Sequence, residues 1–121
     1  MSQKRTREYS YSEEEKAAAV EFLRLASQGE RGKSLMSLVA ILRGLIYECI
    51  ERVYYKRRGK NFGLELNEFE SEVYIRIVNR PPTDFTDDGL LAIGRIKKYS
   101  YLIAENIARD TYKKAEIRKY N

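Results

Sequence analysis

The sequence Ile-Ala-Glu-Asn-Ile-Ala-Arg-Asp-Thr-Tyr-Lys-Lys occupies residues 103–114 of the chain. At helical spacing its isoleucines continue an apolar row made up of Ile96, Tyr99, Ile103 and Ile107. A second, mostly basic row runs beside it through Lys98, Leu102, Glu105, Arg109 and Lys113, and Asn106 lies between the two rows. The segment therefore predicts a helix with an apolar back and a cationic flank. On charge alone a solvated surface helix is the simpler interpretation, because lysine and arginine are common on exposed faces.

Composition favours one helical domain with an uneven distribution of charge. The chain has 121 residues, with only seven glycines and two prolines to interrupt helices. Residues 31–60 carry eight basic and two acidic side chains, residues 61–90 carry two and seven, and residues 91–121 carry eight and three. This alternation indicates two different partners, namely a polyanion for the basic blocks and another molecule for the acidic block.

Composition also argues against several classes of protein. The chain has no histidine and a single cysteine, Cys49, so we expect neither a disulfide within the chain nor a transition-metal site. Cys49 falls on an apolar helical row and is expected to be a small buried hydrophobe. No signal peptide or membrane-length apolar run is visible, which predicts a cytoplasmic protein. With no nucleophile beside a base and no phosphate loop, we expect neither an enzyme nor a cofactor.

The first half of the predicted domain contains two helices. We interpret residues 1–11 as a flexible basic arm, residues 12–117 as a single helical domain and residues 118–121 as a tail. Ser12 and Glu15 fit a capping box that opens the first helix, and Gly29 ends it. The second and longest helix is predicted from Lys33 to Lys56, with Ser34 as its cap.

The second half is predicted to contain two more helices, which completes an all-α, compact bundle of about four helices around the second and fourth. The third is expected from Leu66 to Asn79, because Pro81-Pro82 cannot continue a helix. The fourth is expected to begin between Gly89 and Ile96 and to end near Ile117.

A basic cluster follows Tyr54 and Tyr55, and it consists of Lys56, Arg57, Arg58 and Lys60. Cations at the end of a helix are favourable beside the negative end of its dipole, which explains the cluster without any ligand. Bases beside aromatic rings also suit a phosphate-binding patch. The local sequence supports the two interpretations equally.

The order of residues in the last helix resembles region two of bacterial RNA polymerase sigma factors, most closely the small extracytoplasmic-function type. The family helix has the form Ile-Ala-Arg-Asn-x-Ala-x-Asp-x-x-Arg-Arg, and Ile103, Ala104, Asn106, Ala108 and Asp110 match it. Lys113 and Lys114 stand where the family has arginines, Tyr99 stands where it often has tryptophan, and Glu105 replaces a base. The resemblance covers about residues 35–114 and includes the order of the preceding elements.

This resemblance implies a contact with RNA polymerase core through the third helix. In the family, a helix of the form Asp-x-x-Gln-Glu-x-Phe docks on the coiled coil of the largest polymerase subunit. The corresponding candidate residues here are Glu68, Phe69, Ser71, Glu72, Tyr74 and Ile75. Ser71 stands where the family has its glutamine, which implies altered contacts, and a solvated acidic face is the alternative for these residues.

The resemblance further implies binding of the near, minus-ten-type promoter element and of its melted strand. The candidate DNA-binding residues are Lys56, Arg57, Arg58, Lys60, Arg95, Lys98, Tyr99, Tyr101, Asn106, Arg109, Lys113 and Lys114. We expect Tyr99 both to pack in the core and to lie near bases, and Tyr101 to be more exposed. In the family the preceding loop captures a flipped base, and Phe85 in the loop here is either an anchor or a stacking residue.

Sigma factors of this type also carry a helix-turn-helix domain, and no residues follow Asn121 to form one. The expectation is therefore a sigma-like initiation factor that works with a second protein for the distal promoter element. Two alternatives stay open. One is a helical interaction protein that occupies the sigma site and inhibits or redirects polymerase, and the other is a plain basic nucleic-acid-binding domain.

Overall fold

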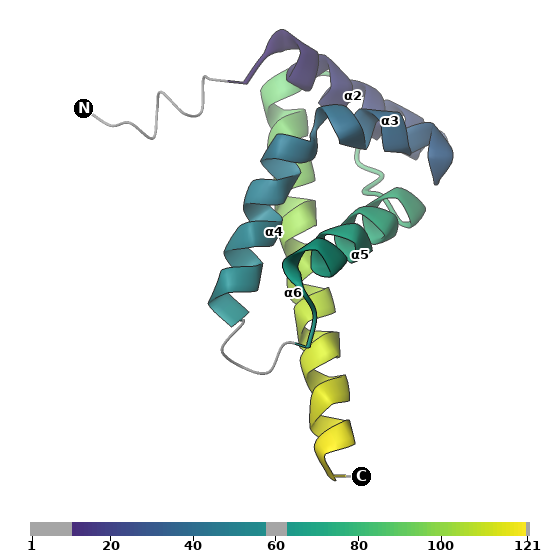
Figure 1. The fold of residues 1–121 in the computed structure, drawn as a ribbon. Coiled ribbons are helices and arrows are strands. Elements are labelled where there is room, and N and C mark those ends of the chain that lie inside the picture. Colours follow the sequence, from purple (N-terminus) through teal and green to yellow (C-terminus); the bar gives the residue numbers. More distant parts are fainter. Residues whose placement is uncertain (1–10, 58–62, 121) are drawn as a thin grey trace, which may run out of the picture.

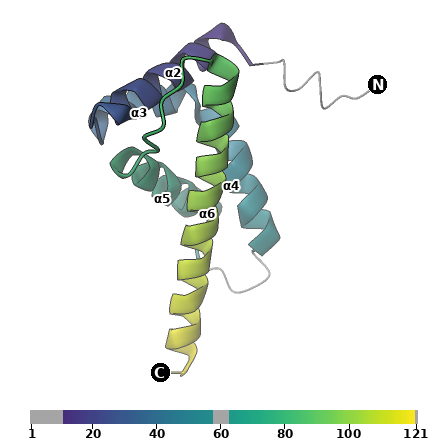
Figure 2. The same ribbon diagram turned by 180° about the vertical axis from the view of Figure 1, so that it is seen from behind.

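The computed structural model describes residues 11–57 and 63–120, and it describes side chains as far as Thr111. Within these residues the chain forms five helices and no strand, which confirms the predicted all-α fold. The helices are α2 (Glu13–Ser27), α3 (Lys33–Ile41), α4 (Arg43–Arg57), α5 (Leu66–Asn79) and α6 (Gly89–Tyr120). Helix α6 runs the length of the molecule, with α4 beside it, α5 crossing it, and α2 and α3 at the end where it begins (Figures 1 and 2).

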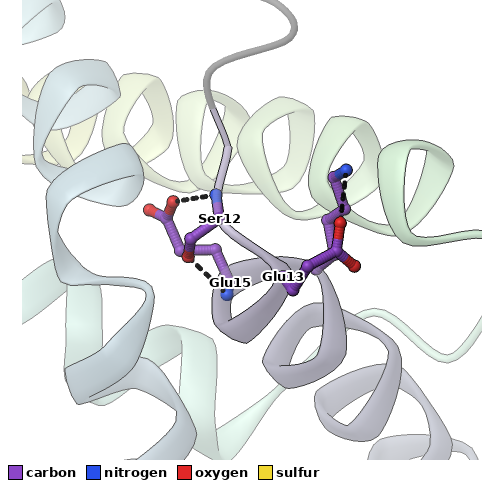
Figure 3. Close-up of polar contacts among 4 residues, drawn as sticks. Ser12, Glu13 and Glu15 are labelled. Carbon is purple, nitrogen blue, oxygen red and sulfur yellow. Dashed lines mark hydrogen bonds and ion pairs between the residues drawn. The ribbon is translucent and has the colours of Figure 1, made fainter.

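Helix α2 begins with the predicted capping box (Figure 3). The Glu15 amide donates to the Ser12 hydroxyl at 3.0 Å, and the Ser12 amide donates to the Glu15 carboxylate at 2.9 Å. These two bonds satisfy backbone donors that the first turn of a helix leaves without a partner inside the helix. The chain leaves α2 through Gly29, whose φ of 94° suits glycine far better than any residue with a side chain.

The prediction of one continuous second helix is wrong, because the chain bends at Leu42 and forms the two helices α3 and α4. Helix α3 carries the buried Leu35 and Val39 and packs chiefly against α2, whereas α4 packs chiefly against α6. A single straight helix could not serve both sets of neighbours. The N-cap of α3 is Gly32 rather than the predicted Ser34, whose hydroxyl donates to the Arg31 carbonyl at 3.1 Å.

At the start of both α5 and α6, a carboxylate side chain accepts a hydrogen bond from a backbone amide that the helix itself leaves without a partner. The Glu65 amide donates to the Glu68 carboxylate at 3.1 Å, and α5 has the predicted bounds. The Leu91 amide donates to the Asp88 carboxylate at 3.0 Å, so α6 starts at Gly89, the early end of the predicted range. Helix α6 continues to Tyr120, beyond the predicted end near Ile117, and so includes most of the predicted tail.

One hydrophobic core joins all five helices. Its largest fully buried side chains are Phe22, Phe69, Leu23, Leu35, Leu42, Ile46, Ile50, Ile77, Ile93, Ile96, Val53 and Val73. Close packing of such side chains fixes the helices relative to one another and therefore fixes the surfaces that they carry. No helix in the described part of the chain is both long enough and apolar enough to cross a membrane.

Candidate functional site

An open groove runs along α6, between α4 and the segment that joins α5 to α6. We call it the α6 groove, and the residues that line it are Cys49, Arg52, Pro82, Asp84, Arg95, Lys97, Lys98, Tyr99, Tyr101, Leu102, Glu105 and Arg109. Five of these residues are basic and two are acidic. A concave, predominantly basic surface with aromatic side chains has the chemistry that binds a nucleic-acid backbone and its bases.

The groove brings together five of the predicted DNA-binding residues, namely Arg95, Lys98, Tyr99, Tyr101 and Arg109. It also includes Arg52, Lys97 and Leu102, which the prediction missed. Arg52 lies one turn after Cys49 on α4, and it joins the groove only because α4 packs against α6. Leu102 was already visible in the mostly basic row and is 54% exposed, which gives the groove an apolar contact point.

Tyr99 and Tyr101 are both half-buried. The Tyr99 hydroxyl donates to the Arg80 carbonyl, and the burial of Tyr99 raises the pKa of this hydroxyl. Both rings pack against the hydrophobic core while lining the groove. This bears out the expected core packing of Tyr99.

The segment before α6 is held against the helix at a second point. The Arg95 guanidinium donates to the Asp84 carbonyl at 3.2 Å, which adds to the bond between Tyr99 and Arg80. Phe85, next to Asp84, is 46% exposed and is therefore not an anchor in the core. Its ring remains accessible beside the α6 groove.

Arg57 and Glu105 form an ion pair that joins α4 to α6. Arg57 Nη2 lies 2.8 Å from Glu105 Oε2, and Nε donates to Oε1 at 3.4 Å. Lys56 Nζ lies 4.0 Å from the same carboxylate. The hydrogen bond from Arg57, aided by the positive charges of Arg57, Lys56 and Arg109, lowers the pKa of Glu105 against the opposing effect of burial.

The remaining predicted DNA-binding residues lie in three different settings. Asn106 is half-buried on α6 and does not line the α6 groove. Arg58 and Lys60 fall outside the described residues, and Lys113 and Lys114 lie on α6 beyond the described side chains.

The groove residue Lys97 has partners of its own, because it donates to the Tyr11 hydroxyl at 2.8 Å and lies 4.0 Å from Glu48.

The outer face of α5 carries a second candidate surface. We call it the α5 stripe, and it consists of the exposed residues Glu68, Ser71, Glu72 and Ile75. Ile75 is 50% exposed, which places an apolar side chain within reach of the acidic residues on the same face. Such a face suits a partner that offers basic groups around an apolar contact.

Two of the residues predicted to bind polymerase do not belong to the α5 stripe. The prediction that Phe69 contacts a partner directly is corrected, because its side chain is fully buried. The centroid of its ring lies 5.9 Å from that of the Tyr54 ring. Its spacing with Val73 and Ile77 places it on the core row of α5. Tyr74 is half-buried, and its hydroxyl donates to Glu70.

The described residues contain no group of acidic, histidine or cysteine side chains that could hold a metal ion. Cys49 is buried, as predicted, and burial raises the pKa of its thiol. Comparisons of the chain with protein-family models, with curated proteins and with solved structures find no match.

Proposed function

We propose that this chain is a sigma-like transcription initiation factor. In this proposal the α5 stripe binds the largest-subunit coiled coil of RNA polymerase core, and the α6 groove binds minus-ten-type promoter DNA, including its melted strand. The observation that carries the proposal is one core bearing an acidic stripe on α5 and a basic, aromatic groove along α6. The order of residues in α5 and α6 supports the same assignment.

In this proposal the two partners bind different residues of one small domain. Helix α5 crosses α6 in front in Figure 1, and α6 lies in front of α5 in the reverse view of Figure 2. The residues of the α5 stripe are exposed, whereas those of the α6 groove lie along α6, α4 and the segment before α6. The two proposed contacts therefore use separate sets of residues.

Charge gives each surface a preference for its partner. Phosphates of DNA attract the basic side chains of the α6 groove, and this attraction falls steeply as salt concentration rises. Tyrosine rings add stacking on unpaired bases, worth about 1–3 kcal/mol per base and largely independent of sequence. The groove is thus suited to a strand that polymerase has already begun to open.

Capture of core polymerase tests the contact through α5. We expect the wild-type chain to retain bacterial core polymerase in stoichiometric amounts, and the double variant Glu68→Lys/Glu72→Lys to lose it. The matched control is Glu13→Lys/Glu14→Lys, which makes the same change of charge at exposed positions on α2. Absence of capture by the wild-type chain at low salt, without competing sigma factors, would refute the polymerase contact.

Variants of α6 separate the proposal from its two alternatives. Lys98→Gln/Arg109→Gln removes two exposed positive charges of the groove and should abolish promoter opening while sparing polymerase capture. Retention of polymerase with no effect of these variants on transcription would indicate an interaction protein that occupies the sigma site. Binding of DNA without any polymerase capture would indicate a plain nucleic-acid-binding domain.

A further inference from the structure

Glu105 is an acidic residue inside a predominantly basic surface. Its carboxylate is 18% exposed and lines the α6 groove, while its partner Arg57 is 29% exposed and comes from the end of α4. Two hydrogen bonds join the side chains across a separation of 48 residues in sequence. The packing of α4 against α6 brings the two side chains together, so the pair is formed in the chain alone.

The carboxylate uses the same donors on Arg57 that a phosphate would use. An arginine guanidinium binds carboxylate and phosphate in the same way, through parallel N–H donors and opposite charge. Lys56, at 4.0 Å, also faces Glu105, and Arg109 is near enough for its charge to affect the carboxylate. A phosphate that binds Arg57 through Nε and Nη2 must therefore displace Glu105.

We propose that Glu105 is an internal competitor of phosphate for Arg57, and that it removes one phosphate contact beside the α6 groove, where Glu105 lines the groove and Arg57 lies next to it. This inference rests on the proposed binding of nucleic acid in the groove and adds a residue that sets its strength. Its effect is to weaken binding of the free domain to DNA of any sequence. Binding in the proposed complex then depends more on the polymerase contact and on the melted bases.

The salt dependence of single-stranded DNA binding tests the inference directly. The probe is a fluorescein-labelled single-stranded oligonucleotide of mixed sequence, followed by anisotropy between about 50 and 200 mM salt. For Glu105→Gln we expect a slope of log K against log salt concentration that is steeper by about 0.7, the value for one additional phosphate contact. Affinity at the lowest salt should rise by a factor of roughly ten.

Two further variants separate this competition from a general gain of positive charge. Glu13→Gln removes one acidic charge from the exposed first turn of α2, at a residue that does not line the groove, and should leave affinity and slope nearly unchanged. Glu105→Gln/Arg57→Gln should return both quantities to wild-type values, because the released cation is no longer present. Thermal unfolding confirms that each variant is folded before its binding is compared.

The outcomes distinguish this inference from the proposed function. Equal behaviour of Glu105→Gln and Glu13→Gln, with measurable wild-type binding, would refute the competition and leave the proposed function intact. A gain that survives removal of Arg57 would also refute it. Absence of DNA binding by every variant at low salt would overturn both the competition and the DNA contact, while polymerase capture would still report on the α5 stripe separately.

Discussion

The Tyr74 hydroxyl donates a hydrogen bond to Glu70 Oε2 at 2.7 Å, and Arg43 Nη2 lies 2.9 Å from the same oxygen. Glu70 thus joins α5 to the first turn of α4, and its side chain is only 13% exposed. Burial and the hydrogen bond to Glu70 raise the pKa of Tyr74 well above its usual range. Glu70 therefore has a structural role, unlike the exposed acids Glu68 and Glu72 on the same helix.

Replacement of Tyr74 by phenylalanine should separate stability from polymerase binding. Tyr74→Phe removes a half-buried hydrogen bond to a charged group and should lower the free energy of unfolding by about 1–2 kcal/mol in urea titrations. Polymerase capture should persist, because the hydroxyl is bound by Glu70, which does not belong to the α5 stripe. Loss of capture by a folded Tyr74→Phe variant would instead place the hydroxyl in the interface.

Phe69 and Ile75 should respond to truncation in opposite ways. Phe69→Ala empties a fully buried position and should destabilise the domain by about 3–5 kcal/mol. Ile75→Ala changes a half-exposed side chain, so unfolding should change little while polymerase capture weakens. Chemical unfolding and capture measured on both variants test the assignment, and unchanged capture by Ile75→Ala would exclude Ile75 from the contact.

Substitution by alanine should destabilise the domain at one glycine of α6 and stabilise it at another. A Cβ at Gly89 would lie 2.7 Å from Lys16 Cβ, so Gly89→Ala must push α6 away from α2 and should cost about 1–2 kcal/mol. A Cβ at Gly94 meets nothing within 4 Å, and Gly94→Ala should stabilise the helix by about 0.5–1 kcal/mol. Equal shifts of the melting temperature in both variants would contradict the close approach at Gly89.

The ion pair of Glu105 should make stability depend on pH in the acidic range. Because Arg57 lowers the folded-state pKa of Glu105 below its usual 4.5, the pair stabilises the fold above that value. The contribution is lost as pH falls through the lower, folded-state pKa. Glu105→Gln should therefore cost about 1 kcal/mol at neutral pH and less at an acidic pH below 4.5.

Urea unfolding at the two pH values measures this difference. Arg57→Gln serves as a second variant, because it removes the same hydrogen bonds from the other side and should show the same loss confined to neutral pH. A cost that is equal at neutral and acidic pH in both variants would mean that packing, and not the charge of Glu105, links α4 to α6.

Local signals in the sequence were enough to predict several boundaries. The capping box at Ser12 and Glu15 sets the start of α2, and Pro81-Pro82 follows the end of α5, because both act within a few residues. The bend at Leu42 carries no such signal. Its apolar row continues unbroken from Leu35 to Val53, and the break arises from neighbours that lie far away in sequence.

The candidate site was predictable to the extent that it lies on one helix. Lys98 and Arg109 belong to the basic row of α6, and both line the groove. The contribution of Arg52 and the pairing of Glu105 with Arg57 depend on the packing of α4 against α6. Helical periodicity within a single segment contains no information about such a contact.

Two hydrogen bonds join α6 to the segment that precedes it. The Tyr99 hydroxyl donates to the Arg80 carbonyl, and the Arg95 guanidinium donates to the Asp84 carbonyl. These two hydrogen bonds therefore hold the backbone on this side of the α6 groove in place before any ligand binds. A ligand that enters the groove loses its own translational freedom on binding, but it need not order the backbone that receives it. We expect cutting either link to make the entropy of association less favourable, even if every side chain that touches the ligand is retained.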